Sequence, residues 1–173
     1  GGNASSAWTY TQGTVDASNS TISFRNSGNV SVDSGTMSFN NVIFNAGANF
    51  TITGTMTVSG NLTLTAVGNI NTGTIAVAGN ITTTDSGVIG GTGTIKINGT
   101  GDQTLQVDGV GGTGTITAYN IAKPSGTLTI KDTIQIDGSA TSIYTSGVVD
   151  PGTSTVVFKS GSKTITGSIM FNN

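Results

Sequence analysis

Five short segments of one pattern recur along the chain at an almost constant spacing. Each is Gly-Thr followed by an apolar, a polar or small, and an apolar residue, and they begin at Gly35, Gly54, Gly73, Gly93 and Gly114. Successive starts differ by 19, 19, 20 and 21 residues. Such alternation is typical of strands with one buried face, and a regular spacing near twenty residues indicates a solenoid. We predict an all-β fold, a single parallel β-solenoid of about eight rungs of roughly 19–22 residues, right-handed by the usual rule for crossovers.

Alignment of these segments predicts two columns of buried side chains, one for each apolar position. The first column is Met37, Met56, Ile75, Ile95, Ile116 and Leu128. The second column is Phe39, Val58, Val77, Ile97, Ala118 and Ile130. The composition agrees with this fold, because Glu is absent and Leu, Lys and Arg are scarce, whereas Thr, Val, Ile, Gly and Asn are abundant.

A longer internal repeat joins the two ends of the sequence. Residues 10–24, YTQGTVDASNSTISF, match residues 144–158, YTSGVVDPGTSTVVF, without a gap, and the match resumes at residues 37–41 and 169–173. We therefore expect residues 1–9 to be an N-terminal arm or edge strand. Residues 10–173 then form one solenoid domain with an internal duplication, in which 10–41 resembles 144–173. No polar cap is visible at either end, and we expect uncapped terminal rungs.

Charge and composition limit the classes of partner. The formal net charge is −2 and the six basic residues are scattered, so the sequence predicts no surface for nucleic acid or for an anionic membrane. No apolar run is long enough for a membrane span. Cysteine is absent, and the surface is rich in Thr, Ser, Asn and Gly with only 8% charged residues. This composition favours an extracellular wall or matrix, or the cell surface.

Several runs resemble degenerate repeats of large secreted surface proteins of bacteria and archaea. They are GTSTVVF (152–158), GTGDQTL (99–105), FNNV (39–42) and GNLTL (60–64). The proteins that carry such repeats are adhesin-like and are predicted to form β-helices. The resemblance implies an exported, repeat-built surface protein, and it transfers no catalytic residue to this chain.

The sequence offers few groups for catalysis or metal binding. Without His, Glu or Cys, only eight Asp side chains could act as acid, base or ligand, and most are next to turn residues. Asp102 and Asp108 are the one pair within a single loop, which leaves a polysaccharide-cleaving enzyme as a minor alternative. We expect no enzyme activity, no cofactor and no dedicated metal site, and a calcium ion at a corner Asp stays open.

A regular set of threonines is predicted to face outwards from the solenoid. They are Thr36, Thr55, Thr57, Thr74, Thr94, Thr115, Thr117, Thr127 and Thr129. Regular Thr columns on a flat face could order water in ice binding or could bind glycans, but exposed strands favour Thr in any case. Ala76 and Lys96 interrupt the second column at its middle.

Seven Asn-x-Ser/Thr sequons also occur along the chain. They begin at Asn3, Asn19, Asn29, Asn49, Asn61, Asn80 and Asn98. Whether they carry glycans is left open, because a corner Asn followed by an alternating Thr creates this motif without selection for modification.

Uncapped ends lead to a structural role as the favoured hypothesis. We expect a subunit of an extracellular filament or surface fibre that assembles head-to-tail, with other copies of itself as partners. The predicted subunit interface is Trp8, Tyr10, Ile22, Phe24, Ile165, Ile169, Met170 and Phe171. The alternative is a monomeric binding module, an adhesin segment or an ice- or glycan-binding protein, that uses the Thr-rich face and has surface glycans as partners.

Overall fold

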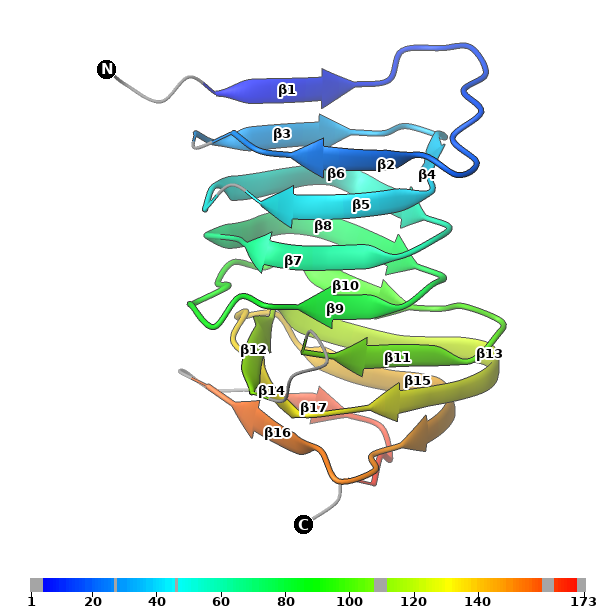
Figure 1. Ribbon diagram of the computed structural model, residues 1–173, viewed down its shortest axis with the longest axis vertical. Helices are drawn as coiled ribbons and strands as arrows, with labels where there is room; N and C mark the ends of the chain where they lie inside the picture. The colour runs from blue at the N-terminus through cyan, green and yellow to red at the C-terminus, as the bar shows by residue number, and fades with distance from the viewer. Residues whose placement is uncertain (1–4, 27, 46, 108–111, 160–163, 171–173) are drawn as a thin grey trace.

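The structure is a computed structural model that describes residues 5–26, 28–45, 47–107, 112–159 and 164–170. These residues form seventeen β-strands and no helix, and every strand pair is parallel. The chain winds through about eight rungs and confirms the predicted β-solenoid. Followed downwards in Figure 1, it runs rightwards along the strands at the back and leftwards along those at the front, which is a right-handed coil.

Each rung presents strands on three successive faces, named here in chain order. The first face holds β1 (Ser6–Thr9), β3 (Val30–Asp33) and the opening halves of β6 (Asn49–Val58) and β8 (Asn69–Val77). The second face holds β4 (Ser38–Phe39), the closing halves of β6 and β8, β10 (Thr94–Ile97), the openings of β13 (Ala118–Ile130) and β15 (Ser142–Asp150), and β17 (Ile165–Thr166). The third face holds β2 (Thr21–Phe24), β5 (Asn41–Asn45), β7 (Leu62–Ala66), β9 (Ile81–Thr83), β11 (Gln103–Gln106) and the closing halves of β13 and β15.

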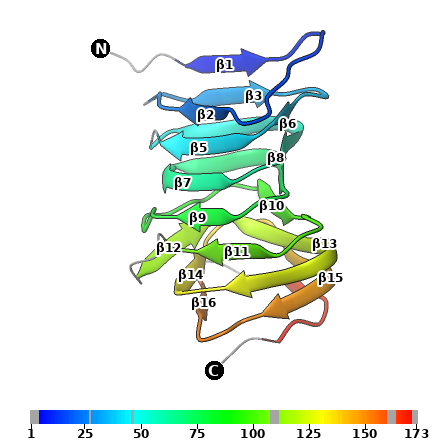
Figure 2. The same cartoon turned by 45° about the vertical axis from the view of Figure 1, so that its right-hand side comes forward.

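The lower rungs differ from the upper ones. Their first strands are β12 (Thr113–Ile116), β14 (Thr133–Ile136) and β16 (Thr155–Phe158), which form a separate three-stranded sheet. Figure 2 shows β13 and β15 curving around the side of the solenoid, so that each joins the second face to the third without a break. The remaining fourteen strands accordingly belong to one continuous sheet.

Two kinds of glycine shape the corners. Gly54 and Gly73 have φ of 65° and 76°, and this left-handed conformation lets β6 and β8 bend from the first face to the second. The sequence pattern Gly60-Asn61 also favours positive φ, but neither residue adopts it. Gly60 is needed for a different reason, since a Cβ there would lie 2.9 Å from the carbonyl oxygen of Asn40 in the rung above.

Asparagine side chains tie successive rungs together at the corner before the third face. The Asn41 Oδ1 accepts a hydrogen bond from the Asn61 N–H at 2.9 Å, and the Asn61 Oδ1 accepts one from the Asn80 N–H at 2.8 Å. The Asn80 Oδ1 accepts from the Thr104 N–H at 2.8 Å. Asn61 and Asn80 begin sequons, so these motifs coincide with a structural ladder that satisfies corner N–H groups.

The core lies between the faces and is mostly apolar. Inward side chains of consecutive rungs stack in columns, and most are completely buried. Near the N-terminal end the core is aromatic: the rings of Phe44 and Phe50 stack with centroids 4.2 Å apart, and Phe24 lies 5.5 Å from Phe44. Such columns require the same register in every rung, which the parallel pairing provides.

The predicted columns are right for their first four members and wrong at the fifth and sixth. Ile95 and Ile97 pair with Tyr119 and Ile121 rather than with Ile116 and Ala118. The Gly-Thr segment at Gly114 lies in β12, where Ile116 pairs with Ile136. This segment starts the first strand of its rung instead of the second, because the preceding rung is longer after β10. Likewise the segment at Gly126 lies on the third face, where Leu128 pairs with Gln103.

The two copies of the internal repeat share their local hydrogen bonds. The Tyr10 and Tyr144 hydroxyls donate to the carbonyl oxygens of Gly13 and Gly147, each three residues ahead. Asp16 and Asp150 each accept a bond from a backbone N–H two residues ahead, and Ser20 and Ser154 each bond to a carbonyl three residues back. The copies diverge afterwards, since Phe24 lies on the third face and Phe158 lies in β16.

Candidate functional site

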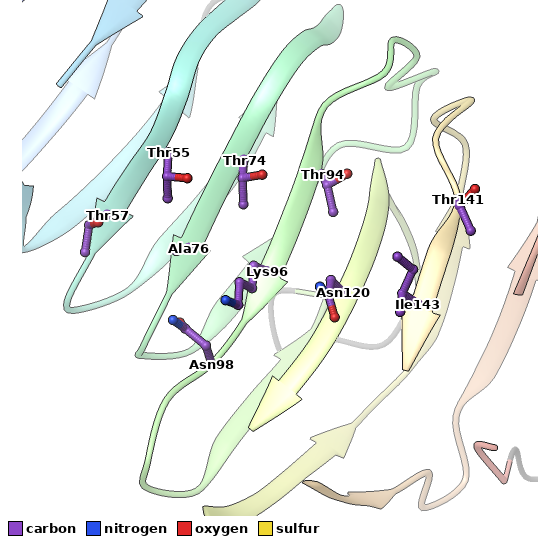
Figure 3. Close-up of a pocket in the computed structure, with 10 residues that line it drawn as sticks. All are labelled: Thr55, Thr57, Thr74, Ala76, Thr94, Lys96, Asn98, Asn120, Thr141 and Ile143. Atoms are coloured by element: carbon purple, nitrogen blue, oxygen red, sulfur yellow. The ribbon is translucent and has the colours of Figure 1, made fainter. Parts of the chain in front are cut away.

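The second face carries a hollow of about 550 Å³ on its outer surface. Figure 3 shows its lining side chains spread over adjacent strands of this face. They are Thr55, Thr57, Thr74, Ala76, Thr94, Lys96, Asn98, Asn120, Thr141 and Ile143. We call this feature the second-face hollow.

The floor of the hollow consists of two outward columns in exact register. In one column Thr55, Thr74 and Thr94 pair across β6, β8 and β10. The neighbouring column runs Thr57, Ala76, Lys96, Asn120 and Ile143 across β6, β8, β10, β13 and β15. Ala76 is the smallest of these side chains and is only 6% exposed, so the surface is depressed between the longer ones around it. The Thr-rich face is therefore concave rather than flat.

One wall of the hollow is built by residues 137–143. Ser139 reaches back two rungs, where its N–H and hydroxyl both donate to the Gly91 carbonyl oxygen at 2.8 and 3.0 Å. Gly138 crosses close over the rung between, because a Cβ there would lie 2.9 Å from the Ala118 nitrogen and against the Thr117 hydroxyl. This segment is thus anchored and does not depend on a ligand for its position.

Several of the predicted threonines do not line this hollow. Thr115 and Thr117 are completely buried, so their assignment to the outward face is wrong. The Thr115 hydroxyl donates to Gln135 at 3.3 Å, and that of Thr117 donates to the Gly93 carbonyl at 2.9 Å. Thr127 and Thr129 lie on the third face, in register with Val148 and Asp150 of β15.

The other five predicted threonines lie on or beside the second face. Thr55, Thr57, Thr74 and Thr94 line the second-face hollow. Thr36 is exposed in the turn before β4, one position before the buried Met37. The predicted outward orientation of the threonines is correct where the Gly-Thr segments open the second face. It is wrong below β10, where the Gly-Thr segments no longer begin the second face of their rung.

A buried polar cluster lies behind the corner that follows β10. Lys123 is 1% exposed, and its ammonium donates to the carbonyl oxygens of Gly99 and Gly101 at 2.9 and 2.8 Å and to Gln103 Oε1 at 2.8 Å. The Gln103 amide nitrogen donates in turn to Val77 at 3.1 Å. Burial lowers the pKa of Lys123, and the nearby Asp102 carboxylate acts in the opposite direction.

This cluster was missed in the sequence, although a signal for it exists. Inward residues alternate along β11 and just after it as Gln103, Leu105 and Val107, and along β13 as Ile121 and Lys123. A Gln and a Lys at inward positions of adjacent rungs predict that they meet in the core.

The aspartates act chiefly as turn and corner groups. Asp33 and Asp85 each accept a hydrogen bond from a backbone N–H two residues ahead, as do Asp16 and Asp150. Hydrogen bonds from Ser18 lower the pKa of Asp16, which is fully exposed. Asp102 accepts from the Thr127 N–H at 2.8 Å, and Asp108 lies outside the described residues. Within the described part of the chain, no three His, Cys, Asp or Glu side chains gather as metal ligands.

Of the predicted interface residues, Trp8, Ile22 and Phe24 lie in β1 and β2 at one end of the solenoid, and Ile165 lies in β17 near the other (Figure 1). At the N-terminal end Trp8 is 37% exposed, its ring meets that of Phe39 edge-on at 5.7 Å, and Tyr10 and Ile22 are half-buried. Phe24 is already buried in its own rung. At the C-terminal end the exposed fraction is 42% for Ile165 and 82% for Met170, and Ile169 is half-buried. Phe171 lies outside the described residues.

Each end also has a small apolar hollow, and the two are related by the internal repeat. The N-terminal one has a volume of about 170 Å³ and is lined in part by Val15 and Met37. The C-terminal one has a volume of about 260 Å³ and is lined in part by Val149 and Ile169, which match them in the repeat. Equivalent sequences thus produce an apolar recess at both ends.

Two further residues belong to the partly covered apolar residues at the C-terminal end. Val156 and Phe158 of β16 are half-buried and continue the inward columns of Ile134 and Ile136. The alternation TVVF at residues 155–158 could have predicted that Val156 and Phe158 face inwards from a strand.

Comparisons with protein-family models, curated proteins and solved structures gave no match. Among the described residues no helix has the length and apolar character needed to cross a membrane.

Proposed function

We propose that this protein is a structural subunit of an extracellular filament, in which one solenoid stacks on the next through their terminal rungs. The observation that carries the proposal is that inward apolar side chains of the first and last described rungs, among them Trp8 and Phe158, are only partly covered, unlike their column partners in the middle of the solenoid. Because a parallel β-solenoid is a stack of similar rungs, the natural cover for a terminal rung is another rung.

The N-terminal contribution comes from Trp8 and Ile22. Trp8 pairs with Val32, which pairs with Ile52, and these two are 0% and 2% exposed, whereas Trp8 is 37% exposed. Trp8 therefore occupies an inward position without the cover that its column partners have. On the third face Ile22 pairs with Val42 and is half-buried in the same way.

The C-terminal contribution comes from β16 and β17. β16 pairs with β14, and β17 pairs with β15. Val156 and Phe158 supply the apolar surface, and Ile165 and Met170 extend it. The two ends differ in residues, so the contact is heterologous and propagates into a fibre instead of closing a dimer. The low charge and the Thr-rich surface support the extracellular setting.

The test places a lysine at one end of the solenoid or at the other, and then mixes the two variants. Sedimentation velocity and electron microscopy of the full chain are expected to show concentration-dependent filaments. Trp8→Lys and Phe158→Lys each block one end and should each give monomers, whereas Val88→Lys, at a residue 61% exposed on a corner away from the ends, should polymerise normally.

Mixing the two blocked variants separates loss of the interface from loss of the fold. Trp8→Lys keeps a functional C-terminal end and Phe158→Lys keeps a functional N-terminal end, so an equimolar mixture should form dimers and stop there. A wild-type chain that stays monomeric from micromolar to millimolar concentration, or a mixture without dimers, would refute the proposal.

A further inference from the structure

The lining of the second-face hollow has a restricted chemistry. Its polar groups are the hydroxyls of five threonines, the amides of Asn98 and Asn120, and the ammonium of Lys96. All of its lining residues are described, and none is a carboxylate or an aromatic ring. Hydroxyls and amides both donate and accept hydrogen bonds, and the Lys96 ammonium adds hydrogen-bond donors and a positive charge. This set matches a ligand that is rich in hydroxyl groups and carries negative charge.

The shape of the hollow indicates an extended ligand. Its lining runs across five adjacent strands, from Thr55 of β6 to Ile143 of β15. At a strand spacing of roughly 4.8 Å this is about 19 Å along the solenoid axis. Thr141 and Ile143, at the end of the anchored segment 137–143, lie at the β15 end of this row of strands (Figure 3).

Other ligands for this face fit less well. Ordering of water at an ice surface needs a flat array, whereas Ala76 lies at the bottom of a depression and Lys96 interrupts the hydroxyl column. Single-stranded nucleic acid needs aromatic rings for base stacking and several cations for its phosphates, and the lining has no ring and one cation.

We propose that the second-face hollow binds a chain of acidic polysaccharide, with uronic acid residues lying along the solenoid axis. Lys96 donates a charge-assisted hydrogen bond to a sugar carboxylate from the centre of the floor. The hydroxyls of Thr74 and Thr94 and the Asn120 amide bond to sugar hydroxyls on either side. This activity is separate from end-to-end assembly, since the hollow lies on the side of the solenoid.

The experiment is affinity electrophoresis of the full chain through gels that contain polygalacturonate, alginate or the neutral polysaccharide dextran. Retardation is expected in the two acidic gels and not in dextran. It should weaken as salt is raised, because an ion pair is screened. Lys96→Gln should lower the affinity about tenfold or more, the loss of one charge-assisted hydrogen bond. Thr74→Val should weaken binding less and leave its salt dependence unchanged.

Lys131→Gln is the matched control, since Lys131 is an exposed cation away from the hollow and its replacement changes net charge equally. All measurements are repeated in the Trp8→Lys background, so that failure to polymerise and failure to bind are read separately. Circular dichroism confirms that each variant is folded. The proposal is overturned if neither acidic gel retards the chain, if dextran retards it as strongly, or if Lys96→Gln and Lys131→Gln weaken binding alike.

Discussion

Replacement of the buried Lys123 by methionine tests whether the polar cluster in the core is structural. Methionine has a similar length and fits the same space, so the change removes the ammonium without a large cavity. The ammonium gives three hydrogen bonds, to Gly99, Gly101 and Gln103. Gly101 is exposed, and water can replace the lost donor there. Gly99 is buried, and its carbonyl loses a partner that solvent cannot replace.

The expected loss of unfolding free energy follows from these lost hydrogen bonds. An unsatisfied buried acceptor costs about 1–3 kcal/mol, and each hydrogen bond to a charged group contributes about 1.5–3 kcal/mol against the cost of burying the charge. Exchange of a whole buried ion pair for apolar groups can be neutral, but here the carbonyl acceptors stay in place after Lys123 is gone. We expect Lys123→Met to lower the free energy of unfolding by about 3 kcal/mol, which lowers Tm by roughly 6–12 °C.

The pH dependence of the unfolding free energy provides a second test of Lys123. Burial holds the pKa of Lys123 below its ordinary value of 10.5, so between the two values the unfolded chain binds the proton more tightly than the folded one. Stability of the wild type therefore gains from Lys123 as pH rises through this window. The difference in unfolding free energy between the wild type and Lys123→Met should widen towards pH 10.5, and contributions common to both proteins cancel.

Urea denaturation followed by circular dichroism at several pH values measures both effects. Lys131→Met makes the same chemical change at an exposed position and should alter stability by less than about 0.5 kcal/mol. If the two variants cost the same, the buried ammonium does not have the structural role assigned to it. If the difference between wild type and Lys123→Met narrows with rising pH, burial does not lower the pKa of Lys123.

Three further substitutions test other parts of the fold by the same denaturation assay. The Tyr119 hydroxyl is buried without a hydrogen-bond partner among the described residues, and burial raises its pKa to about 12. Tyr119→Phe should raise stability by about 1 kcal/mol and remove the loss expected as pH rises from 10 towards 12, where the folded chain keeps the proton longer. Asn61→Ala removes the acceptor for the Asn80 N–H and should cost about 1 kcal/mol, with no change if the ladder is incidental. Gly138→Ala places a Cβ against Thr117 and should cost about 1–3 kcal/mol, whereas an unchanged Tm would mean that the wall is not tightly packed.

The sequence predicts the solenoid because its information is local and repeated. Alternation at Met56 and Val58 fixes the inward side of a strand, and near-copies at constant spacing require parallel stacking in register. The prediction fails where a rung changes length. The segment at Gly114 looks like the earlier copies, yet it opens a different strand, and Thr115 and Thr117 become buried. The face on which a residue lies depends on the lengths of all preceding rungs. One longer corner therefore shifts the predicted face of every later residue.

The second-face hollow could be predicted only in part. Its floor follows from the repeats, since Thr55, Thr74 and Thr94 occupy equal positions. Its wall depends on Ser139 reaching Gly91, a contact between residues 48 apart that no local pattern encodes. The interruption at Ala76 and Lys96 was visible in the sequence as a defect in a Thr array. In three dimensions the same two residues supply the depth of the hollow and its charge.

The two proposals make a joint prediction, because the second-face hollow runs along the axis on which the subunits would stack. Filament growth then places the hollows of successive subunits in line, and one polysaccharide chain can occupy several of them. The second and later contacts become intramolecular, so a filament should bind a long acidic chain about 10² times more tightly, or more, than the end-blocked Trp8→Lys monomer. A short uronate oligosaccharide that fills one hollow should bind both forms equally. Equal affinity of monomer and filament for the long polymer would mean that the hollows are not aligned, and the stacking geometry proposed here would have to be abandoned.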